Sequence, residues 1–163
     1  MGAGVTVWYG AAAAWWAPLE RDARRRCGPA LRHRYGYDYG EGHRLVYLLS
    51  GLDVVGDPDP VDVTITFYAN PPYPTYGLPP QDSPRVHAKV NATSKHRYPD
   101  GALCLWYPLD PPDRRWTSDK GLLDLIEITR RHLFLENYWR ATGGHHGGEW
   151  LIEDAPHGFG KAG

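Results

Sequence analysis

A proline-rich segment from Asn70 to Pro80 limits the possible folds of this chain more than any other feature. Proline fixes φ and has no backbone N–H to donate, so this segment suits neither a helix nor a central strand, and we expect a stiff, ordered loop. Polar and apolar residues alternate on both sides of it, from 61 to 68 and from 85 to 91, as is typical of half-buried strands. The segment is therefore predicted to connect two strands.

The other elements follow from similar patterns. Two further strands are predicted from 31 to 39 and from 43 to 50. Apolar residues and a threonine recur at i, i+3, i+4, i+7 and i+11 from Leu122, which predicts a long helix from about 118 to 138 with Ser118 as its N-cap. A first helix is expected after Pro18, with the arginines at 24 to 26 on its solvated face.

These elements predict one α+β domain over residues 1 to 163, with a core from about 18 to 140. Glycine and histidine alternate in pairs from 143 to 148, which predicts a flexible linker. The residues after it, 149 to 163, are expected to fold back onto the domain as a C-terminal arm.

Cys104 follows a strong turn signal. In Tyr98-Pro99-Asp100-Gly101 the proline fixes φ, the aspartate can bond its own backbone and the glycine accepts positive φ. A cysteine just after such a turn is expected near the surface, where its thiolate can be reached. Both sequence neighbours of Cys104 are leucine, however, and free cysteine behaves as a small apolar residue, so this octapeptide taken alone favours a buried structural cysteine.

The order of strand, proline loop, strand, cysteine turn, tryptophan and helix resembles the ubiquitin-conjugating enzyme (UBC) fold. In that family, the catalytic thiol lies in a segment that reads His-Pro-Asn and then Ile-Tyr-Pro-Asn-Gly, a small residue, Ile, Cys and Leu. Residues 98 to 105 of this chain match the second part nearly position for position. The family's Tyr-Pro and Pro-Pro-x-Val stretch is similar to Pro71 to Pro74 with Pro79-Pro80 and Val86. Its tryptophan ahead of the second helix is similar to Trp116. The resemblance covers about residues 30 to 140. It implies a four-stranded antiparallel meander between two helices, with Cys104 as the acyl-carrying nucleophile.

Two departures from the family affect the expected site. His96 occupies the position of the family's asparagine, which stabilises the oxyanion when an amine attacks the thioester. A histidine there could donate to the oxyanion or act as a base, or it could only order the loop, and both interpretations stay open. The segment before Trp116 is also longer than in the family, and either Asp110 or Asp113 in it could orient or deprotonate the incoming lysine.

The chain resembles the conjugating-enzyme-like proteins of bacterial antiphage operons, above all those of cyclic-oligonucleotide-based signalling systems (CBASS). The resemblance lies in residues 96 to 105, Trp116, residues 136 to 143 and Ala155-Pro156-His157-Gly158. The resemblance implies that Cys104 accepts the C-terminal carboxylate of a partner as a thioester and passes it to an amine, without a cofactor. The implied partner is a cGAS-like nucleotidyltransferase or a ubiquitin-like protein. Because 163 residues leave no room for an adenylating domain, any activating enzyme is expected to act in trans.

Composition excludes several other functions. The formal net charge of −1, with one short arginine run, argues against nucleic acid as the main ligand. No apolar run is long enough to span a bilayer and no secretory signal is evident, so we expect a cytoplasmic protein whose two cysteines stay reduced. His145 and His146 have no third ligand at fixed spacing, so no metal site is predicted. Cys27 follows three arginines that could depress its pKa, but no motif surrounds it, and we interpret it as structural.

Two alternatives to the conjugating function remain. The first is a catalytically silent binding module of the same fold, against which the retained Cys104 in its full motif argues. The second is a cysteine hydrolase with His87 or His96 as its base, although neither histidine sits in a hydrolase signature.

Overall fold

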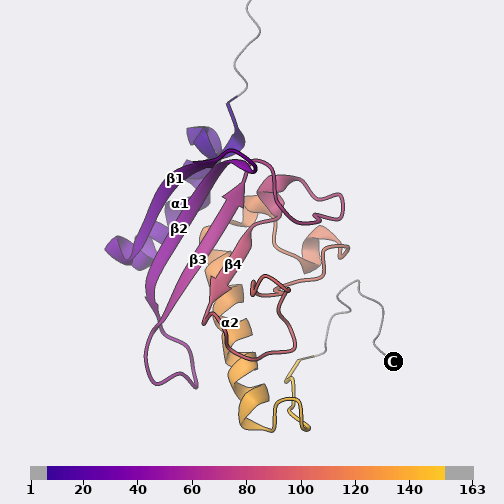
Figure 1. Ribbon diagram of the computed structural model, residues 1–163. Coiled ribbons are helices and arrows are strands. Elements are labelled where there is room, and N and C mark those ends of the chain that lie inside the picture. The colour runs from indigo at the N-terminus through magenta and orange to yellow at the C-terminus, as the bar shows by residue number, and fades with distance from the viewer. Residues whose placement is uncertain (1–6, 153–163) are drawn as a thin grey trace, which may run out of the picture.

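Four antiparallel strands form one sheet, and the strands follow one another in chain order. The computed structural model describes residues 7–152, and its sheet contains β1 (Leu31–Asp38), β2 (Gly42–Leu52), β3 (Val61–Tyr68) and β4 (Arg85–Ala88) in the order β1-β2-β3-β4. Figure 1 shows this sheet with the helices behind it. The predicted α+β class and the meander of four strands are confirmed.

The fourth strand is shorter than predicted. It ends at Ala88 rather than at residue 91, because Lys89 and Asn91 take positive φ values of 50° and 73°. Left-handed backbone at two of the next three residues cannot continue an extended ladder. The chain therefore leaves the sheet at Ala88 and turns toward the segment that carries Cys104.

Both long helices pack on the same face of the sheet, α1 (Ala13–Cys27) and α2 (Leu122–Ala141) (Figure 1). One apolar core joins them to the strands, with Leu19 and Ala23 from α1, Leu125 and Leu133 from α2, and Phe67 from β3 all buried. Burial of apolar side chains from every layer in one cluster is the main stabilising contribution in a domain of this size. This core fixes the distance between the last strand and α2, between which the cysteine segment runs.

The start of each helix differs from the prediction. Ser118 is not the N-cap of α2: residues Ser118–Lys120 form a separate 3-10 turn, and Gly121, at φ 87°, precedes the first helical residue. The Gly121 carbonyl accepts a hydrogen bond of 2.9 Å from the Trp116 indole, which holds this break in place. The first helix begins at Ala13, ahead of Pro18, because its first turn contains alanines, the strongest helix formers.

The glycine- and histidine-rich stretch packs against the end of α2. The Gly144 N–H donates to the Trp139 carbonyl at 2.8 Å, the Gly148 N–H donates to the Gly144 carbonyl at 2.8 Å, and the His145 ring meets the Trp139 ring edge-on at 4.9 Å. Hydrogen-bonded turns thus occupy the predicted linker. Of the predicted C-terminal arm, residues 149 to 152 belong to the described part, whereas 153 to 163, including the family-like segment 155 to 158, lie outside the described residues.

Candidate active site

The cysteine turn is closed by its own backbone. The Tyr98 N–H donates to the Ala102 carbonyl at 2.8 Å, and the Gly101 N–H donates to the Tyr98 carbonyl at 2.9 Å. Gly101 has φ 85°, which explains the glycine there, and the Asp100 carboxylate accepts from the Ala102 N–H at 2.9 Å. The turn predicted from Pro-Asp-Gly is confirmed, and it places Cys104 directly after a tight loop.

Backbone hydrogen bonds also attach this turn to the rest of the fold. The Leu103 N–H donates to the Val86 carbonyl on β4 at 2.9 Å, and Arg97 and Leu103 form an isolated antiparallel bridge. The Cys104 N–H donates to the His96 carbonyl at 2.9 Å. The position of the sulfur is therefore set by the edge of the sheet on one side and by the His96 segment on the other.

Cys104 is less accessible than the turn before it indicates. The residue is 8% exposed, and its preceding neighbours Ala102 and Leu103 are buried with it. The expectation of a reachable thiol near the surface is therefore wrong, and the burial that the octapeptide alone favours is confirmed. Burial raises the pKa of the Cys104 thiol to about 12; Arg85 and a hydrogen bond with Tyr98 act in the opposite direction, and the charges of Asp100 and Glu136 add to the rise. At neutral pH the resting thiol is thus almost entirely protonated.

A group of charged and aromatic side chains next to Cys104 is not evident from the sequence. The Arg85 guanidinium lies between two tyrosine rings, 3.8 Å from the centroid of Tyr73 and 3.9 Å from that of Tyr98. Its Nε lies 3.2 Å from an Asp100 carboxylate oxygen. A cavity of about 30 Å³, enough for a water molecule, is lined by Arg85, Tyr98 and Trp106 among others. Sequence places these residues on separate elements, and only the fold brings them together.

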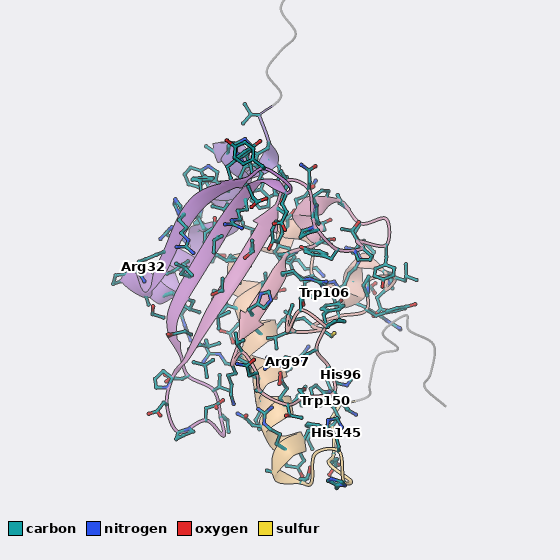
Figure 2. The ribbon with its side chains drawn as sticks, in the orientation of Figure 1. Arg32, His96, Arg97, Trp106, His145 and Trp150 are labelled. Carbon is teal, nitrogen blue, oxygen red and sulfur yellow. The ribbon has the colours of Figure 1, made fainter. Side chains whose placement is uncertain are left out.

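His96 lies in a buried aromatic cluster. It is 7% exposed, its ring meets the Trp150 ring edge-on at 4.4 Å, and the His132 ring lies at 6.4 Å. Figure 2 shows His96 and Trp150 side by side, so the described start of the C-terminal arm covers this residue. His96 orders the loop through its carbonyl bond to Cys104, which is one of the two roles expected from the sequence. Its role toward an oxyanion stays a prediction.

The two predicted acidic residues occupy the longer loop before Trp116. Asp110 is half-buried, and its carbonyl accepts from the Arg115 Nε at 3.0 Å. Asp113 is exposed in the 3-10 turn Pro112–Arg114. Their role toward an incoming lysine stays a prediction. The carboxylates whose charges raise the pKa of the Cys104 thiol are Asp100 and Glu136.

Glu136 forms a buried charge network that no sequence pattern indicates. It is fully buried on α2, and its carboxylate lies 3.0 Å from Arg97 Nη2, 3.4 Å from His132 Nε2 and 3.4 Å from Arg140 Nη1. Burial raises the pKa of Glu136, but the hydrogen bonds and charges of His132 and Arg97 outweigh it, so the pKa lies below its ordinary value. Arg97 also donates to the Ala88 carbonyl at 2.9 Å, so this network ties the cysteine segment to both α2 and β4.

Other features of the described chain bear on alternative sites. Within residues 7–152, no group of three or more His, Cys, Asp or Glu side chains is arranged to bind a metal ion. Both cysteines are free thiols. In the same part of the chain, no helix is long and apolar enough to cross a membrane.

Comparison of the chain with family models, with curated proteins and with solved structures found no match. The resemblance to conjugating enzymes therefore rests on the residues of this chain and on their order along it.

Proposed function

We propose that this protein is a ubiquitin-conjugating-like cysteine acyltransferase of bacterial antiphage defence, with a UBC-like fold. The observation that carries the proposal is the setting of Cys104: it directly follows a Tyr-Pro-Asp-Gly turn that is hydrogen-bonded to the last strand of a four-stranded meander. A long helix follows the same segment in the chain. This combination of motif and place in the fold supports an acyl-carrying thiol more strongly than an incidental core cysteine.

The chemistry has two acyl transfers. The Cys104 thiol loses its proton to solvent, and the thiolate attacks the activated C-terminal carbonyl of the partner; the tetrahedral intermediate then expels the activating group and leaves a thioester. An amine of the target next attacks the same carbonyl, loses a proton, and releases the Cys104 thiolate. His96 stabilises the oxyanion of this second step, and Asp110 or Asp113 orients the amine.

The proposed acyl donor is a cGAS-like nucleotidyltransferase or a ubiquitin-like protein, loaded by an activating enzyme that acts in trans in the cytoplasm. Burial of Cys104 fits a carrier that is unreactive until a partner docks, because a protonated, shielded thiol resists both oxidation and unwanted acylation.

The same burial favours a second candidate, a catalytically silent binding module of this fold. In such a protein, Cys104 would only fill space beneath the turn, and a partner would dock without an acyl transfer.

Incubation with a synthetic thioester separates the two functions. The C-terminus of a nucleotidyltransferase from the same genome is prepared as a mercaptoethanesulfonate thioester, mixed with the protein, quenched in acid and resolved on a non-reducing gel. A carrier gives an adduct that reducing agent removes and that an added amine consumes. A silent module gives no adduct even where the two proteins co-purify, and a hydrolase gives the free carboxylate without any amine.

A further inference from the structure

The guanidinium of Arg85 is held more tightly than a surface cation. Its side chain is 11% exposed, although Arg85 begins β4 at the sheet's edge. The guanidinium lies between the Tyr73 and Tyr98 rings. Its carbon atom is 3.8 Å from the centroid of Tyr73 and 3.9 Å from the centroid of Tyr98. The Tyr73 hydroxyl is itself fixed by a hydrogen bond of 2.5 Å to the Ser83 carbonyl. The proline loop, β4 and the cysteine turn thus all contribute to one clamp.

This clamp is joined to the cysteine segment through the backbone. The Leu103 N–H donates to the Val86 carbonyl. Leu103 precedes Cys104 and Val86 follows Arg85, so Cys104 and Arg85 flank the same backbone hydrogen bond. Tyr98 links the two residues, because its ring stacks on the guanidinium and its side chain lowers the pKa of the Cys104 thiol. Arg85 and Tyr98 also share the wall of the 30 Å³ cavity with Leu103.

The charges around the thiol oppose one another. Asp100, on the turn, and Glu136, on α2, disfavour a thiolate, whereas Arg85 favours it and outranks both carboxylates in effect on the pKa of Cys104. Asp100 lies within 3.2 Å of Arg85 and its side chain is 44% exposed, so it both partners the cation and faces solvent. Glu136 is engaged with Arg97 and His132.

We propose that Arg85, clamped between Tyr73 and Tyr98, is the positioning residue that stabilises the negative charge of the Cys104 thiolate, and that Asp100 restrains it as a counter-charge. The proposal deepens the proposed function, on which it rests for the identity of the electrophile. Its chemical content is independent of any partner: a thiolate next to a desolvated, immobilised guanidinium is favoured by the field of that cation. A partner group that neutralises or displaces Asp100 would then release the full effect of Arg85 on the sulfur.

Alkylation of Cys104 tests this without an acyl donor. In a Cys27→Ala background, the second-order rate constant with iodoacetamide is measured by intact mass between pH 7.5 and 9.5 for Arg85→Met, Arg85→Lys and Asp100→Asn. Each unit of rise in thiol pKa costs about tenfold in thiolate but returns about threefold in nucleophilicity, so the rate falls about threefold. From the fastest to the slowest, we expect the order Asp100→Asn, the background, Arg85→Lys and Arg85→Met. The rate constant of Arg85→Met should lie at least about threefold below that of the background.

A purely structural role for Arg85 would not give this order by charge. Arg32→Met, on β1 at the far edge of the sheet, is the matched control and should leave the rate unchanged (Figure 2). Equal rates for a folded Arg85→Met and the background would overturn the proposal; if that variant does not fold, an unchanged or slower rate in Asp100→Asn would do so. If the alkylation rates follow the order of charge but no thioester adduct forms, the role of Arg85 is supported and the conjugating function is refuted. If an adduct forms but the rates do not follow the charge, the conjugating function is supported and the role of Arg85 is refuted.

Discussion

The two cysteines of this chain occupy contrasting surroundings. Cys27 is the half-buried last residue of α1, and burial raises its pKa even though Arg130 and Arg26 lower it. Cys104 is buried beneath a turn, and burial raises its pKa to about 12. The arginines that precede Cys27 in sequence thus do not make it a stronger acid, because loss of hydration outweighs them.

Under the proposed function, this contrast teaches that the ionisation of a resting thiol does not identify the nucleophile. By exposure Cys27 is the easier thiol to modify, yet no turn or motif surrounds it. Cys104 has a backbone fixed at the sheet edge, a clamped cation and a buried charge network nearby. An acyl carrier requires this kind of fixed geometry more than it requires a permanently ionised sulfur.

The largest expected effect is the loss of the adduct in Cys104→Ala. With the synthetic thioester, this variant should form no thiol-labile adduct, because it lacks the only sulfur in the turn. Cys27→Ala is the matched control and should form the adduct at the normal rate. Densitometry of non-reducing gels measures both, and an undiminished adduct in Cys104→Ala would reverse the assignment of the two thiols.

The second prediction compares the charge networks near the two thiols. Glu136→Ala should destabilise the fold by about 3–5 kcal/mol, because it leaves Arg97 buried without its partner. Glu127→Ala, on the same helix and near Cys27, breaks an exposed pair with Arg130 and should cost less than about 1 kcal/mol. Urea denaturation measures both free energies of unfolding, and equal values would show that the Cys104 region is no more firmly held.

The pH dependence of the Glu136 contribution has a defined sign. Since the pKa of Glu136 is lower in the folded protein than its ordinary value of 4.5, its stabilising effect is present above that pH and is lost as pH falls through the folded pKa. The difference in unfolding free energy between wild type and Glu136→Gln should therefore shrink in acid. A difference that grows below pH 4 would contradict this assignment.

A smaller effect is expected from His96. If His96 donates to the oxyanion, His96→Ala should slow discharge of the thioester to an amine by about 10²-fold and slow loading of Cys104 much less. His96→Asn should recover part of the loss, since asparagine also supplies a donor. Single-turnover rates measure both steps. Normal loading and discharge in the two variants would leave His96 with its loop-ordering role alone, and equal loss of both steps would mean that the loop had collapsed.

Periodicity and turn chemistry predicted the strands, the two helices and the closed turn before Cys104, because these depend on local residue order. The predicted start of α2 at Ser118 is wrong, because Gly121 takes a positive φ that a pattern of apolar residues does not encode. The meeting of Arg85, Tyr73, Tyr98 and Asp100 depends on contacts between distant segments, whereas the two leucines beside Cys104 already favour its burial. An arginine in an alternating strand gives no local sign that two rings will enclose it.

The most direct test of the central claim is to locate the acyl group. The adduct from the synthetic thioester is quenched at low pH, digested with pepsin and mapped by mass spectrometry, with hydroxylamine treatment of a parallel sample. We predict that the acyl mass lies on the peptide containing Cys104, that hydroxylamine removes it, and that Cys104→Ser carries it as an oxyester resistant to reducing agent. An acyl group found on Cys27 or on a lysine, with Cys104 unmodified, would contradict the account.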